Sequence, residues 1–194
     1  MSKINLEKYP NLKLVKPLKW EEVFDIWRQN EASDPKWMEH YKSRGFATWE
    51  AWRETYAVPF KCAEADWGFY VITNPLQDIP NFCGGPFRGW KENHYGEKDT
   101  MTFAKLANLD HFQNFYKTED IIKNFPNGTI ISGMEVDGDI YIIEGMHRCL
   151  AIALAKKRGL DMPIDIKIAL AKSPQGKLPL VGMNLSYKKP DEAK

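Results

Sequence analysis

The chain has 194 residues, of which 43% are hydrophobic, 27% charged and 13% aromatic; this excludes a disordered or fibrous protein. The formal net charge of +1 at pH 7 gives no overall attraction to nucleic acid or anionic membranes. Three widely spaced cysteines without a CxxC pair, Cys62, Cys83 and Cys149, argue against a disulfide framework and a closed zinc site. No signal-peptide pattern or membrane-length apolar run is found. We therefore expect a cytoplasmic protein without membrane contact.

The first third of the chain is predicted to be helical and aromatic. Residues 1–19 contain several lysines and prolines and are expected to be extended. Trp20, Val23, Phe24 and Trp27 then follow the i, i+3, i+4, i+7 spacing of one helix face. We interpret this stripe as core packing rather than a cofactor surface.

Two further helices are predicted from their capping residues. Asp34 before Pro35 is typical of a helix start, Gly45 of a helix end, and Thr48 of a second cap. For Arg44 and Arg53 the default interpretation is a solvated helix face, and the alternative is contact with an acidic substrate. His40 and His111 are interpreted as surface or core histidines.

A strand over residues 66–74, ending at Pro75, precedes a long segment rich in glycine and proline. Segments of this kind are often binding loops. We treat 75–100 as a candidate substrate loop, with Arg88 and His94 as contacts. The alternative is an ordered excursion without function. Gly84 and Gly85 match no phosphate-loop motif.

The remaining sequence predicts a helix over 101–126, a hairpin and a final helix and strand. Residues 129–136 and 139–144 form the hairpin strands around Asp137–Gly138, a strong turn signal. A helix follows to Gly159, and then a strand within 162–171. We expect an α+β fold with a small mixed sheet. The expected divisions are a helical extension (1–65), a core (66–172) and a partly disordered tail (173–194).

The joint between the hairpin and the last predicted helix carries an unusual pair of basic residues. A helix N-terminus bears a partial positive charge, so His147 and Arg148 there each cost about 0.3–1 kcal/mol when exposed. A bound anion would offset this, held by the backbone at Gly145 and Met146 and by both side chains. The alternative is an ion pair between Arg148 and Glu144.

The run "EGMHRCLAIALAKKRG" within residues 128–170 resembles the signature turn of the ParB/sulfiredoxin-like superfamily. The resemblance implies that Gly145, His147 and Arg148 hold nucleotide phosphates. Sulfiredoxins place a catalytic cysteine where this chain has Met146, and partitioning ParB proteins carry a different box and a downstream helix-turn-helix. The pattern is closest to stand-alone kinases of the free-serine-kinase type.

These observations predict a nucleotide-dependent phosphotransferase acting on a small molecule, with ATP or ADP and Mg²⁺ as cofactors. Glu144 and His147 are the predicted catalytic residues, Glu144 as a general base or a magnesium ligand. The alternative function is a non-catalytic ParB-like module that binds nucleotide or nucleic acid, although the neutral charge disfavours nucleic acid. The acceptor, the metal ligands and the oligomeric state stay open.

Overall fold

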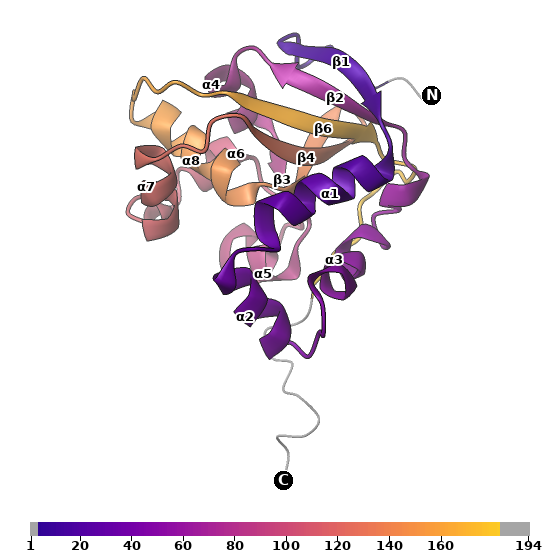
Figure 1. Ribbon diagram of the computed structural model, residues 1–194. Helices are drawn as coiled ribbons and strands as arrows, with labels where there is room; N and C mark the ends of the chain where they lie inside the picture. The colour runs from indigo at the N-terminus through magenta and orange to yellow at the C-terminus, as the bar shows by residue number, and fades with distance from the viewer. Residues whose placement is uncertain (1–3, 183–194) are drawn as a thin grey trace.

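A six-stranded mixed sheet organises the fold (Figure 1), in a computed structural model that describes residues 4–182. The strands in chain order are β1 (Leu12–Leu18), β2 (Trp67–Ile72), β3 (Cys83–Gly84), β4 (Thr129–Val136), β5 (Asp139–Glu144) and β6 (Ile166–Lys172). Across the sheet they run β1-β2-β6-β4-β5-β3. β4 is parallel to β6 and β3 to β5, whereas the other neighbours are antiparallel. The predicted α+β class is confirmed.

The predicted hairpin turn has the backbone that its residues favour. Asp137 and Gly138 both have positive φ, 51° and 81°, as expected for the central residues of the tight turns that match strand twist. The two strands pair from Val136 with Asp139 up to Ser132 with Glu144. The hairpin therefore delivers Glu144 to the end of a buried strand.

The helices gather mostly below and beside the sheet in Figure 1, with α1 to α3, indigo to purple, on one side and α7 and α8, salmon to orange, on the other. Their bounds are α1 (Trp20–Glu31), α2 (Pro35–Ser43), α3 (Trp49–Ala57), α4 (Pro75–Asp78), α5 (Arg88–Trp90), α6 (Phe103–Leu106), α7 (Tyr116–Lys123) and α8 (Met146–Lys157). Short 3₁₀ turns lie at Cys62–Glu64, Ile79–Asn81 and Asp110–Phe112, and a π-helical turn lies at Lys91–Tyr95. None of the helices in the described part is both long and apolar enough to span a bilayer.

The predicted helix starts of the first third are confirmed. The Asp34 carboxylate accepts a hydrogen bond from the Lys36 N–H at 2.9 Å, and the Thr48 hydroxyl accepts one from the Ala51 N–H at 3.2 Å. Val23 and Trp27 are fully buried, so the aromatic stripe of α1 belongs to the core. Residues 12–18 are an edge strand paired with β2, a pairing that the sequence analysis did not predict.

The single helix predicted over 101–126 is wrong, because the segment is divided into α6, a 3₁₀ turn and α7. The Gln113 side chain donates hydrogen bonds to the carbonyls of Ala107 and Leu109, at 2.7 and 3.2 Å. Side-chain bonds of this kind compete with the helical ladder. The break lets Phe103 and Phe112 both become buried.

The long segment 75–100 is ordered by short helices and by the strand β3. The first part of the predicted tail covers it, because the Val181 N–H donates to Pro86 O at 2.9 Å and the Arg88 N–H to Val181 O at 2.8 Å. The rest of the tail, residues 183–194, lies outside the described residues, and its predicted disorder stays a prediction. The division of the chain at 65 and 172 stays a prediction.

Candidate functional site

The joint between β5 and α8 requires a glycine. Gly145 has φ +98°, and a Cβ there would lie 2.3 Å from Cγ2 of Ile131. No side chain caps α8, and the first N–H groups of a helix have no partner within the helix. The Met146 sulfur accepts a hydrogen bond from the Gly85 N–H at 3.4 Å, so the joint contacts the 75–100 segment. The turn therefore presents uncapped backbone donors, as the phosphate prediction requires.

Arg148 is engaged by residues of the protein itself. Its guanidinium donates hydrogen bonds to the carboxylate of Glu144 and to the hydroxyl of Thr129. The Arg148 and Glu144 side chains are 12% and 4% exposed. Asn30 donates to the other Glu144 oxygen at 3.1 Å. The ion pair that the sequence analysis gave as the alternative is present, and both oxygens of Glu144 are occupied.

His147 does not carry a positive charge at neutral pH. Burial, together with the nearby Lys117, His94 and Arg148, lowers its pKa to about 4. Its ring packs against Trp90 at 5.4 Å and against Phe115 at 6.0 Å between centroids. His147 and Arg148 therefore do not oppose the helix dipole as the sequence analysis supposed, because one is neutral and the other is paired.

The two predicted loop contacts are held in different ways. Nε of Arg88 donates to the carbonyl of Gly182 at 3.2 Å. Nδ1 of His94 lies 2.9 Å from Nε2 of His111, so one ring donates to the other. Burial lowers the pKa of His94 to about 4. His94 is thus a neutral imidazole at neutral pH, hydrogen-bonded to the ring of His111.

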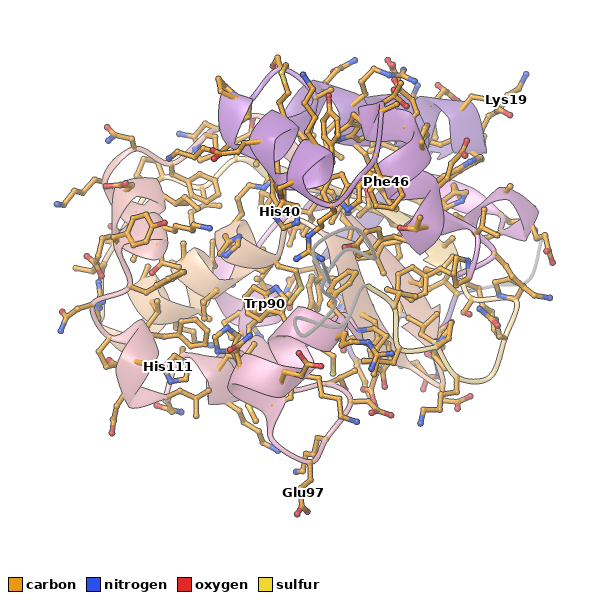
Figure 2. The ribbon with its side chains drawn as sticks, turned by 90° about the horizontal axis from the view of Figure 1, so that it is seen from below. Lys19, His40, Phe46, Trp90, Glu97 and His111 are labelled. Carbon is orange, nitrogen blue, oxygen red and sulfur yellow. The ribbon has the colours of Figure 1, made fainter. Side chains whose placement is uncertain are left out.

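A cavity of about 900 Å³ lies between the N-terminal helices, the 88–94 segment, α7 and the joint. All seven residues predicted for the site line it: Arg88, His94, Glu144, Gly145, Met146, His147 and Arg148. In Figure 2, which looks at the fold from below, His40 of α2 and Trp90 of α5 come from opposite sides of this region. The tertiary structure thus brings the loop and the joint to one cavity.

Several lining residues were missed or misinterpreted from the sequence. Arg53 is 6% exposed, so its interpretation as a solvated helix residue is wrong. Lys117 of α7 lines the cavity, and no sequence motif marks it. Arg44 also lines it, from the C-terminal end of α2. A basic residue within an aromatic helix, as in "WEAWRETY", was the available signal for Arg53.

The cavity holds more basic than acidic side chains. Its Arg and Lys residues are Arg44, Arg53, Arg88, Lys117 and Arg148, and its carboxylates are Glu31, Asp34 and Glu144. Glu31 pairs with Arg53 and Glu144 with Arg148, while Asp34 caps α2. Arg44, Arg88 and Lys117 have no carboxylate within ion-pairing distance in the described residues. The cavity therefore suits an anionic ligand.

The residues present do not form a protein cage for Mg²⁺. Within residues 4–182, no group of three or more His, Cys, Asp or Glu side chains is arranged to hold a metal ion. Mg²⁺ is commonly bound through substrate phosphates with few protein ligands.

A scan against protein-family models and searches of curated proteins and of solved structures found no match to this chain. The resemblance to the ParB/sulfiredoxin-like superfamily therefore rests on the joint and its flanking elements alone.

Proposed function

We propose that the protein binds ATP or ADP in the cavity at the joint and transfers a phosphoryl group to or from a small molecule. One observation carries the proposal: the uncapped N-terminus of α8 opens into a cavity with excess basic side chains and several aromatic rings. Backbone N–H groups at a helix start and nearby basic side chains favour phosphate. The rings of residues such as Trp90 and Phe115 offer faces for a nucleobase.

The roles of the joint residues follow from their partners. The N–H groups of Met146, His147 and Arg148 bind phosphate oxygens, and Lys117 adds a positive charge. Gly145 allows the sharp turn. Arg148 and Glu144 are positioning residues, since each holds the other.

In the direction from ATP, the acceptor hydroxyl oxygen forms a bond to the terminal phosphorus as the bond to the ADP oxygen breaks. The hydroxyl proton passes to the neutral imidazole of His147 and then to solvent. Phosphoryl transfer asks the protein mainly for positioning and for neutralisation of charge. Mg²⁺ in this proposal arrives with the nucleotide phosphates.

Isothermal titration calorimetry with ATP, ADP, CTP and inorganic phosphate, each with and without Mg²⁺, tests binding. Lys117→Gln should weaken nucleotide binding by about 10- to 100-fold, the range for a hydrogen bond to a charged group. Lys123→Gln, on the same helix but outside the cavity, is the matched control. Absence of heat with every nucleotide and with phosphate would show the proposal to be wrong.

A non-catalytic nucleotide-binding module is the second candidate, and one observation favours it. Both oxygens of Glu144 are engaged by Arg148 and Asn30, which disfavours this carboxylate as a base and leaves the weakly basic His147 to accept the proton. Transfer of labelled phosphate from ATP to pooled small-molecule acceptors distinguishes the two functions. Binding without any transfer would favour the module.

A further inference from the structure

The wall of the cavity formed by α2, α3 and α5 contains a second group of arginines, away from the start of α8. We propose that Arg44, Arg53 and Arg88 form a subsite for the carboxylate of a small organic acid with a flat apolar body. We further assign an acid of this class that carries a hydroxyl group as the phosphoryl acceptor, and this assignment rests on the proposed function. Binding of the acid itself does not.

Arg53 is the buried centre of this subsite. Its guanidinium carbon lies 4.9 Å from the ring centres of Trp27 and Trp52 and 5.3 Å from that of Tyr56. One terminal nitrogen donates to Glu31 at 2.5 Å, whereas the buried Nε has no hydrogen-bond partner in the described structure. A guanidinium carries five N–H donors, and unpaired buried donors are costly. Arg53 therefore retains hydrogen-bonding capacity beside the cavity.

Arg44 and Arg88 supply the positive charge that Arg53 alone does not. The charge of Arg53 is matched by Glu31. Arg44 is half-buried in the cavity wall, and Nε of Arg88 is fixed on the Gly182 carbonyl at 3.2 Å. Within residues 4–182 the two terminal nitrogens of Arg88 have no hydrogen-bond partner, so they can donate to a ligand. Planar arginine side chains of this kind bind carboxylates through paired hydrogen bonds.

Aromatic rings connect the arginines and give the subsite its apolar character. Trp37 lies 5.4 Å from Trp52, and Tyr56 lies 5.8 Å from Phe87, the residue before Arg88. All four rings line the cavity. Rings next to arginine donors suit an acid whose body is flat and apolar, because such a body stacks on the rings while its carboxylate meets the guanidinium groups. An acid of this class fits better than a compact inorganic anion.

The cavity has room for both ligands. Its volume of about 900 Å³ is near the upper end of the roughly 300–1,000 Å³ of small-molecule sites. A nucleotide phosphate at the start of α8 leaves the arginine wall for a second molecule.

Binding of benzoate, measured by tryptophan fluorescence and calorimetry on the whole chain, tests the subsite. Trp37, Trp52 and Trp90 line the cavity, so occupancy changes their emission. We expect saturable binding of benzoate, and at least tenfold weaker binding of benzamide, its neutral analogue, and of acetate, which lacks the ring. Equal affinity for benzoate and benzamide would overturn the proposal. Tighter binding of phenyl phosphate than of benzoate at this wall would overturn the assignment to a carboxylate.

Substitutions locate the binding and separate the two proposals. Arg44→Gln and Arg88→Gln should each lower benzoate affinity at least tenfold, whereas Arg28→Gln, an arginine of α1 outside the cavity, should not. Equal effects of Arg44→Gln and Arg28→Gln would overturn the subsite. Lys117→Gln should weaken the binding of ADP more than that of benzoate. Arg44→Gln should weaken the binding of benzoate more than that of ADP. Benzoate binding without any nucleotide binding would support the subsite and refute the proposed function.

Discussion

Arg148 donates a hydrogen bond to the carboxylate of Glu144 across Gly145, so the last residue of β5 holds the first turn of α8. Both side chains are largely buried. The positive charge that stands at an unfavourable helix end is thus matched by a negative charge from the preceding strand. This ion pair explains how the joint is stable without a ligand. It also leaves the backbone N–H groups at the start of α8 available to bind one.

Glu144→Gln should destabilise the fold, because it leaves Arg148 without its anion while preserving side-chain shape. Breaking a buried ion pair by removing one partner costs on the order of 3 kcal/mol. The free energy of unfolding, measured with urea, checks this. The double variant Glu144→Gln/Arg148→Met should recover part of the loss. Asp165→Asn, which removes the more exposed pair with Lys167, should have a much smaller effect, and an equal effect would contradict the role assigned to Glu144.

Gly145→Ala should be more destabilising than Gly159→Ala. Both glycines have positive φ, but a Cβ at Gly159 meets nothing within 4 Å, whereas one at Gly145 meets Ile131. The left-handed backbone conformation alone costs an alanine about 1–2 kcal/mol. Gly159→Ala measures this cost, and the additional loss of unfolding free energy in Gly145→Ala measures the clash with Ile131. Shortening Ile131 to alanine removes the atoms that clash. The loss of unfolding free energy caused by Gly145→Ala should therefore be smaller in an Ile131→Ala background than in the wild-type protein. Equal unfolding free energies for the two glycine variants would show that the approach to Ile131 is not tight.

The stability of the fold should fall as the pH is lowered from about 6.5 to about 4. Burial lowers the pKa of His147 to about 4 from its ordinary 6.5, and the pKa values of His40 and His94 are lowered to about 4 as well. In this range the unfolded chain binds protons that the folded chain does not, so protonation favours unfolding. Urea unfolding at a series of pH values should show the decline.

His147→Gln should make that decline shallower, because it removes one of the three groups. The slope with pH is compared, rather than the absolute stability, since the substitution also changes packing against Trp90. The NMR signals of the His147 ring in the wild-type protein should show no titration between pH 8 and pH 6. An unchanged slope in His147→Gln would contradict the lowered pKa.

The three cysteines should react slowly with Ellman's reagent in the folded protein. Burial raises the pKa of Cys62 to about 12 and that of Cys83 to about 11, where Asp139 adds to the effect. Burial also raises the pKa of Cys149, which is fully buried. Cys83 is half-buried in β3 and should react about a hundredfold more slowly than an ordinary thiol, whose thiolate fraction is higher. All three should react in urea, and Cys83→Ser should remove what reactivity the folded protein has.

The local elements followed from the sequence where short-range chemistry decides structure. The caps at Asp34 and Thr48 and the turn at Asp137–Gly138 depend on hydrogen bonds and backbone conformations within a few residues. The break in the segment 101–126 was not predicted from the sequence, because it depends on where Phe103 and Phe112 pack in the core. Periodicity alone does not contain that information.

The candidate site was likewise predicted from the sequence only in part. The sequence by itself determined the joint from Glu144 to Arg148, because a strand, a glycine and a helix in succession place these residues together. Only the tertiary structure decided that Arg53 is buried, that Lys117 reaches the same cavity, and that His147 is neutral. Burial, and with it the charge state of an ionisable group, is set by elements distant in the chain, and it is these elements that close the cavity around the joint.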